Sequence, residues 1–145
     1  MNKFGEGDLL DVAAPPIVNL LVLRSPDIHR AARFYQALGL LFTLERHGDG
    51  PEHYSSSVNG LVFELYPLAA GRTPTTGTRI GFNVGSVDEL VPLVRELGAE
   101  VVSAPRHSEW GRRAVVRDLD GHTVELVTPS SRDAESPAAA DRGGI

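Results

Sequence analysis

Two glutamates stand in closely similar settings, 61 residues apart along the chain. Glu64 lies in the motif FELYP and Glu125 in VELVTP, and each motif ends in proline a few residues later. A pair of carboxylates can ligate a divalent cation, transfer protons, or hold a guanidinium group. The alternative is two solvated carboxylates on antiparallel strands. The elements that position the two residues decide between these interpretations.

The segments around the two glutamates repeat in the same order. In each half an apolar strand precedes a helix and three more strands, and a Gly/Thr/Pro-rich linker over 69–78 joins the halves. The helix-closing glycines Gly39 and Gly98 are 59 residues apart, close to the spacing of the glutamates. The sequence thus predicts a duplicated β-α-β-β-β module. Helices are expected over 28–38 and 86–97, and strands over 17–23, 40–48, 52–58, 61–68, 78–84, 99–105, 111–118 and 122–129.

Alternation along the last strand of each module determines where the glutamates point. Side chains of a strand project alternately to the two faces of its sheet. One face carries the apolar residues that a helix must cover, and the glutamates project from the other. Because that other face also carries apolar side chains, we expect a concave ligand cleft rather than a solvated surface. The helix face has Phe63, Leu65, Val124 and Leu126, and the glutamate face has Val62, Tyr66 and Val127.

The motifs RSPDIHRAARFYQALGL, VDELVPLVRELGAEVV and RDLDGHTVEL, in this order and spacing, resemble the vicinal oxygen chelate superfamily. Its members include glyoxalase I, bleomycin-resistance proteins and extradiol dioxygenases. The resemblance implies an α+β fold in which two βαβββ modules form a curved mixed sheet with an open cleft. It also implies a small-molecule ligand or substrate and a homodimer. The expected divisions are a flexible arm over 1–14, a domain over 15–129 (modules 15–68 and 78–129) and a disordered tail over 130–145.

The resemblance also implies four metal-ligand positions, in the first and last strands of each module. The last-strand positions are Glu64 and Glu125, and the first-strand positions are Leu20 and Arg79. Leucine has no donor atom, and the cationic guanidinium of arginine has no lone pair to offer. We therefore expect no metal, with Arg79 supplying positive charge beside the carboxylates. If nickel, cobalt, zinc, manganese or iron does bind, Glu64 and Glu125 are its expected ligands.

Other side chains are expected to shape the cleft. Tyr66, Trp110, Leu20 and Arg79 are candidate ligand-binding residues, although Trp110 can also simply cover the edge of the core. His53 is a further candidate for the cleft, but a solvated histidine at the sheet edge is the more ordinary interpretation. His107 and Trp110 are expected in a loop between the sixth and seventh strands.

The remaining histidines and one register alternative complete the expectations. His29 is expected on the exposed side of a helix, His47 at a turn, and His122 on the face opposite Glu125. A register shift of one residue in the first strand of either module would turn Asn19 or Thr78 inward. The segment RDLDG predicts a tight turn.

Composition excludes several classes of function. The net charge of -5 and the sequence pI of about 5.5 argue against a nucleic-acid partner. The chain has no cysteine, which excludes disulfides, thiolate nucleophiles and cysteine-ligated zinc. No apolar run has the length of a membrane span, and the first residues lack the apolar core of a secretion signal. The expected location is the cytoplasm.

Three functional hypotheses follow. The first is a metal-free protein that binds a small organic molecule in a cleft lined by Glu64, Glu125 and Arg79. The second is a divalent-metal-dependent lyase, isomerase or dioxygenase that uses the two glutamates. The third is a metal-free enzyme in which Glu125 or Glu64 is a catalytic general base. The substitutions at Leu20 and Arg79 favour the first and third hypotheses over the second.

Overall fold

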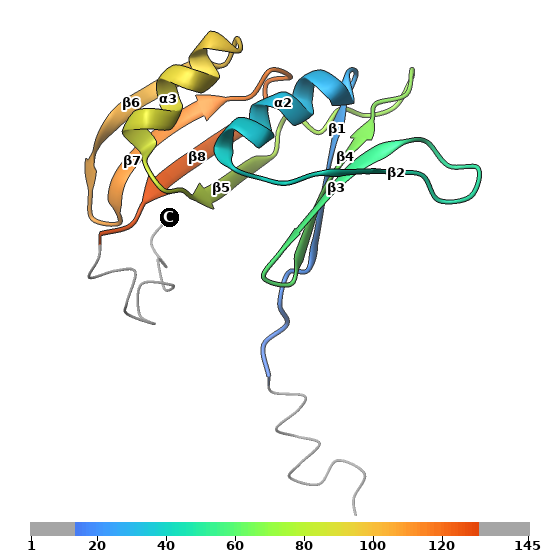
Figure 1. Cartoon of the computed structure of the whole chain (residues 1–145), viewed down its shortest axis with the longest axis horizontal. Coiled ribbons are helices and arrows are strands. Elements are labelled where there is room, and N and C mark those ends of the chain that lie inside the picture. The colour runs from blue at the N-terminus through green and yellow to red at the C-terminus, as the bar shows by residue number, and fades with distance from the viewer. Residues whose placement is uncertain (1–13, 131–145) are drawn as a thin grey trace, which may run out of the picture.

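The computed structural model describes residues 14–130, so the arm and tail expected at the termini lie almost entirely outside the described residues. The elements appear in the order β-α-β-β-β twice, which confirms the predicted duplication (Figure 1). The first module contains β1 (Leu20–Ser25), α2 (Ile28–Leu38), β2 (Thr43–Glu45), β3 (His53–Val58) and β4 (Leu61–Pro67). The second contains β5 (Arg79–Asn83), α3 (Val87–Glu96), β6 (Glu100–Ser108), β7 (Gly111–Arg117) and β8 (Thr123–Thr128).

Each module forms its own four-stranded mixed sheet. The strand orders are β1-β4-β3-β2 and β5-β8-β7-β6, with β1 parallel to β4, β5 parallel to β8, and all other pairs antiparallel. The predicted α+β fold is confirmed. The expected curved sheet consists of two sheets, one per module, because no strand ladder joins them within residues 14–130. The last strand of each module is an inner strand, flanked by neighbours on both sides.

The two helices begin and end where local sequence signals place them. The side chain of Asp27 accepts a hydrogen bond from the N–H of Arg30 (3.1 Å), and Ser86 does the same for Glu89 (3.2 Å). Gly39, with φ +116°, donates its N–H to the Gln36 carbonyl (2.9 Å) and ends α2. These caps satisfy backbone groups that a helix end would otherwise leave unpaired.

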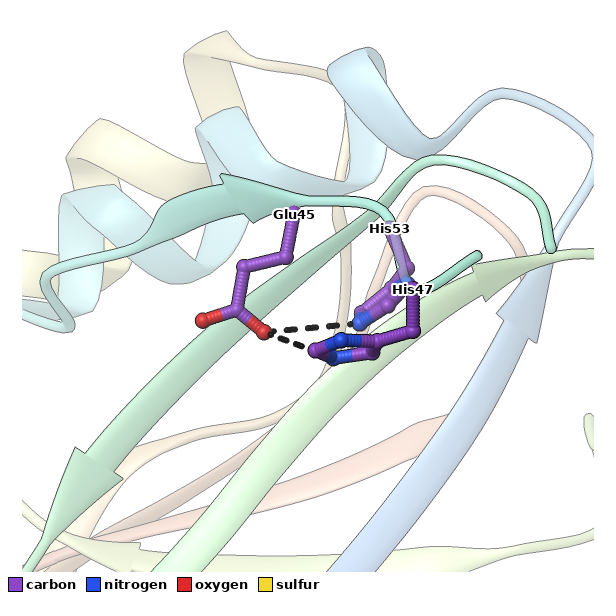
Figure 2. Close-up of side chains that lie close together, drawn as sticks. All are labelled: Glu45, His47 and His53. Atoms are coloured by element: carbon purple, nitrogen blue, oxygen red, sulfur yellow. Dashed lines mark ion pairs between the residues drawn. The ribbon is translucent and has the colours of Figure 1, made fainter. Parts of the chain in front are cut away.

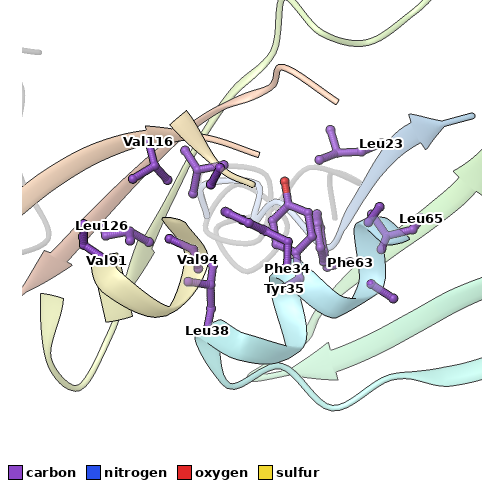
Figure 3. Packing of buried hydrophobic residues seen from close by; sticks show 14 of the residues in the cluster. Leu23, Phe34, Tyr35, Leu38, Phe63, Leu65, Val91, Val94, Val116 and Leu126 are labelled. Atoms are coloured by element: carbon purple, nitrogen blue, oxygen red, sulfur yellow. The ribbon is translucent and has the colours of Figure 1, made fainter. Parts of the chain in front are cut away.

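One hydrophobic core runs through both modules beneath the helices (Figure 3). Tyr35 on α2 is fully buried and meets Phe34 and Phe63 edge-on, with ring centroids 4.8 and 4.9 Å apart. The residues predicted to lie beneath the helices are buried, which confirms the assignment of strand faces. They are Phe63, Leu65, Val124 and Leu126. The opposite face of each sheet is therefore free to carry the glutamates.

Two strands differ in length from the prediction. The strand expected over 40–48 is reduced to β2, three residues long, and the segment after Glu45 forms a turn. In the second module, β6 extends to Ser108, so His107 lies in a strand, and the predicted loop there is wrong. The Ser108 hydroxyl donates to the Gly111 carbonyl (2.7 Å) and accepts from the Trp110 N–H (3.2 Å). These bonds close a turn so short that the strands continue almost to its tip.

Candidate functional site

Glu125 is held by two arginines on the sheet face opposite the helices. Its Oε1 accepts from Arg113 Nε (3.1 Å), and its Oε2 accepts from Arg113 Nη2 (3.2 Å) and from Arg79 Nη2 (2.9 Å). The Glu125 side chain is 9% exposed, and the Arg79 side chain is 53% exposed. The two-point contact with Arg113 is the fork geometry that orients a carboxylate most firmly. Sequence reasoning did not anticipate Arg113, whose pairing depends on which strands flank β8.

The strand order explains this arrangement. β8 lies between β5 and β7, so residues of the right parity on both neighbours share the face of Glu125. Gly81 on β5 is directly paired with Glu125 and offers no side chain, which leaves Arg79, two residues earlier, to reach the carboxylate. Arg79 lies on the glutamate face because the predicted register is correct. The same holds for Leu20, which pairs with Val62.

The arginines also set the protonation state of Glu125. Hydrogen bonding from Arg113 lowers the pKa of the Glu125 carboxyl; burial acts against this shift, and the bond from Arg79 adds to it. The carboxylate is therefore ionised at neutral pH, and protonating it would break its pairing with the guanidiniums. Two cations face one anion, so the cluster carries a net positive charge. The half-exposed Arg79 uses only Nη2 for Glu125 and keeps N–H donors that a ligand can reach.

The four positions that the resemblance assigns to a metal do not fit one. Leu20 has no donor atom, and Arg79 remains a cation. Both oxygens of Glu125 are already bound by guanidinium groups. Within residues 14–130 no hydrogen bond or ion pair joins Glu64 to Glu125 or to Arg79, so the carboxylates have separate partners.

In the first module, the corresponding face is built around His53. This histidine is 1% exposed, so the expected solvated histidine at the sheet edge is wrong. Its ring stacks on that of Tyr66, with centroids 4.1 Å apart and planes 9° apart, and the Arg24 guanidinium lies 5.4 Å from the Tyr66 ring centre. The aromatic contact, together with strand pairing beside β4, excludes water from the imidazole. Glu64 is next to it, with Oε2 3.8 Å from His53 Nε2.

Two further side chains converge on His53, as Figure 2 shows. Glu45 Oε1 lies 3.5 Å from His53 Nε2 and 3.4 Å from His47 Nε2. His47 was expected only as a turn residue, and the turn is what brings it back toward the sheet. A sequence signal for this cluster does exist. Glu45 and His47 alternate across the start of a turn, and His53 begins the next strand.

A second titratable cluster lies in the turn before β8. Asp118 Oδ1 accepts three backbone N–H groups, and Oδ2 accepts from the Tyr35 hydroxyl (2.6 Å) and contacts His122 Nδ1 (2.8 Å). His122 Nε2 in turn meets Thr75 Oγ1 in the linker (2.6 Å). The predicted RDLDG turn is confirmed, and the structure adds that it is buried against α2. Burial raises the pKa of Asp118, but the hydrogen bonds from His122 and Tyr35 outweigh it and lower that pKa. Burial, with Asp118 beside it, raises the pKa of Tyr35.

The remaining predicted site residues lie on the faces that carry the glutamates. Trp110 stands at the tip of the β6–β7 turn, with its ring centre 5.9 Å from the Arg113 guanidinium. Leu20 is 52% exposed at the start of β1. Whether these residues contact a ligand remains a prediction.

Comparisons with known proteins agree with this architecture. A family model described as the Glyoxalase/Bleomycin resistance protein/Dioxygenase superfamily matches residues 17–126. A hypothetical protein, SA1046 from S. aureus, shares 23% identity and a TM-score of 0.64, with 83% of this chain and 98% of that chain covered. TnmS3, an antibiotic binding protein from Streptomyces sp. CB03234, shares 23% identity and a TM-score of 0.63, with 81% and 98% covered. The structure of the oxidase ChaP-H2 shares 21% identity and a TM-score of 0.62, with 79% and 94% covered.

At these identities the solved structures establish the fold alone. None of the curated proteins compared matches the chain. Within residues 14–130, neither helix has the length and apolar character of a membrane span.

Proposed function

Since the chain belongs to the Glyoxalase/Bleomycin resistance protein/Dioxygenase superfamily, we propose that it binds a small organic molecule in a cleft lined by Glu64, Glu125 and Arg79. Binding takes place without a metal at the positions that the superfamily uses. The observation that carries the proposal is the Arg79–Glu125–Arg113 cluster, a carboxylate held by two guanidiniums on the face free of helices.

The chemistry of this cluster favours a ligand with an anionic or strongly hydrogen-bond-accepting group. Arg79 is half exposed and carries unused N–H donors, and Glu125 fixes the plane of its guanidinium. A ligand carboxylate, phenolate or carbonyl would meet donors already oriented. Trp110, beside Arg113, offers an aromatic surface for the rest of the molecule.

The state of Glu125 favours binding over general-base catalysis. A base that works near neutral pH has a pKa close to the working pH, whereas the arginines hold the pKa of Glu125 below its ordinary value. Among similar folds, TnmS3 is described as an antibiotic binding protein and ChaP-H2 as an oxidase, so the fold accommodates both roles. The ion-paired Glu125 supports the first role for this chain.

The test uses Trp110, the sole tryptophan of the chain, as the reporter. Quenching of its fluorescence is titrated with aromatic carboxylates and polycyclic phenols, salicylate being the simplest probe. The strongest probe is then titrated against Arg79→Leu. Losing a hydrogen bond to a charged partner costs about 1.5–3 kcal/mol, which corresponds to a Kd about 10–150-fold weaker.

Arg112→Leu is the matched control for this experiment. Arg112 is also an arginine and directly precedes Arg113, but it points to the helix side and pairs with Asp88 on α3. Its replacement should leave the Kd unchanged. Equal binding by wild type and Arg79→Leu, or equal weakening in Arg112→Leu, contradicts the proposed site.

We also expect a homodimer, as the superfamily resemblance implies. Three large apolar side chains before and at the start of β1 are exposed: Ile17 (83%), Val18 (74%) and Leu20 (52%). Such a contiguous apolar segment is typical of a surface that another chain covers. Light scattering coupled to gel filtration gives the mass directly, and Val18→Asp should shift a dimer toward the monomer. A monomeric wild-type protein contradicts this part of the proposal.

A further inference from the structure

The cluster of Glu45, His47 and His53 has the composition of a transition-metal site. The three side chains offer two imidazole nitrogens and one carboxylate oxygen, all within 4.8 Å of one another. Glu45 and His53 are direct cross-strand partners on β2 and β3, and His47 follows two residues after Glu45 (Figure 2). The His47 carbonyl accepts a hydrogen bond from the Gly50 N–H (2.9 Å), so the turn that carries His47 is closed. Three potential ligands therefore converge from a paired hairpin and its turn.

The hydrogen bonding of His53 leaves the right nitrogen available. Its Nδ1 lies 3.2 Å from the Pro51 carbonyl oxygen, which can only accept, so Nδ1 carries the proton. The lone pair is then on Nε2, the atom that faces Glu45 and Glu64. Metal-bound histidines commonly donate their second ring N–H to a backbone carbonyl in this way, which fixes the tautomer and the ring orientation.

The spacing of the donor atoms fits a tetrahedral ion. Two atoms bound to zinc at 2.0–2.1 Å in tetrahedral geometry lie about 3.4 Å apart, and octahedral neighbours at 2.1 Å lie about 3.0 Å apart. The observed separations are 3.4 Å from Glu45 to His47 and 3.5 Å from Glu45 to His53. Both are too long for good hydrogen bonds. The 3.4 Å from the Tyr66 hydroxyl to His53 Nε2 is also long, so Nε2 has no well-formed partner.

The Asp118–Asp120–His122 cluster shows the contrast. It also groups three candidate ligands, but the partners of Asp118 and His122 already occupy their donor and acceptor atoms. Asp118 accepts from three backbone N–H groups and from Tyr35, and both nitrogens of His122 have close partners at 2.8 and 2.6 Å. That cluster is a completed hydrogen-bond network, whereas the one around His53 is not.

We infer that Glu45, His47 and His53 bind a zinc ion, in a site separate from the superfamily's metal positions and from the Arg79–Glu125–Arg113 cluster. Two histidines and one glutamate form a ligand set that zinc uses where it keeps a fourth position open. Here Glu64 and the Tyr66 hydroxyl lie beside His53 Nε2. They border the fourth position, where a bound water or a ligand oxygen would find hydrogen-bond partners. The exposed His47, at 73%, gives zinc access from solvent.

The test is calorimetric titration of zinc into tag-free protein freed of metal with a chelator. Wild type should bind one zinc per chain. His47→Ala should bind it more than about 100-fold more weakly, since losing a ligand costs more than the 10–100-fold typical of outer-sphere partners. Because His47 is exposed, this variant should fold normally, as circular dichroism can verify, whereas replacing the buried His53 risks the fold. Glu45→Gln, which keeps the shape of the side chain, should also weaken binding.

Two control variants distinguish this site from zinc binding elsewhere on the chain. His107→Ala removes an exposed histidine of the second module and should leave zinc affinity unchanged. Glu125→Gln should also leave it unchanged, and a loss there would place the metal at the superfamily positions and overturn the inference. Cobalt, used in place of zinc, should show the intense visible absorption of tetrahedral coordination. Absence of stoichiometric binding, equal affinity in His47→Ala, or an octahedral cobalt spectrum each overturns it. Ligand binding through Arg79 is measured separately, so either proposal can fail alone.

Discussion

Replacing Arg113 by methionine tests the organisation of the site around Glu125. The substitution keeps most of the apolar stem of the side chain and removes the guanidinium. Two hydrogen bonds to Glu125, at 3.1 and 3.2 Å, are lost, while the bond from Arg79 at 2.9 Å remains. Glu125 Oε1 is then left without its partner in a side chain that is only 9% exposed.

The expected cost follows from these contacts. Removing one partner of a fully buried ion pair costs about 3–5 kcal/mol, and a hydrogen bond to a charged group contributes about 1.5–3 kcal/mol. Because Arg79 still neutralises Glu125 and is itself half exposed, the lower end applies. We therefore expect a loss of about 2 kcal/mol in the free energy of unfolding. With an m-value of about 2 kcal/mol per molar, the urea midpoint should fall by about 1 M.

Urea denaturation at pH 7, followed by circular dichroism, measures this loss. Arg112→Met is the control, because it changes the adjacent residue, whose exposed pair with Asp88 lies on the other side of the sheet; its midpoint should stay near that of wild type. Glu125→Gln and the double variant complete a cycle, in which we expect the two losses to be less than additive.

The pH dependence gives a second measure. The folded-state pKa of Glu125 is lowered, so its pairing stabilises the protein above the unfolded pKa of about 4.3 and is lost as pH falls through the folded value. The difference between wild type and Arg113→Met should therefore be complete at pH 7 and shrink in acid. Equal midpoints for the Arg113 and Arg112 variants, or a difference that does not depend on pH, would refute the reasoning.

The remaining predictions concern the buried network and one turn. Tyr35→Phe removes the 2.6 Å bond to Asp118 and should cost about 2 kcal/mol in urea unfolding, whereas Tyr54→Phe, whose hydroxyl meets an exposed histidine, should cost at most about 0.5 kcal/mol. The pKa of Asp118 is lowered on folding, so stability should decline as pH falls below about 4, and a flatter acid profile is expected for Asp118→Asn. Gly111→Ala places a Cβ against the Thr128 carbonyl at φ +124° and should lower the thermal midpoint clearly, while Gly85→Ala, with open space around it, should not.

The sequence by itself was sufficient for the fold. The equal spacing of the helix-ending glycines and of the two glutamates indicated a duplicated module, and the caps at Asp27 and Ser86 fixed where the helices begin. Alternation along the last strands placed Glu64 and Glu125 on the face away from the helices. These features depend on residues a few positions apart, so local geometry and the need to bury apolar side chains determine them.

The partners of the site residues were decided only by the tertiary structure. Arg113 meets Glu125 because β7 is the neighbour of β8, a pairing that no local pattern specifies. His53 is buried because Tyr66, on another strand, stacks on it. His47 becomes a candidate zinc ligand because β2 stops after three residues and its turn folds back toward Glu45. Strand pairing brings residues into contact through the arrangement of the whole sheet, so such contacts were not predictable from the spacing of residue types alone.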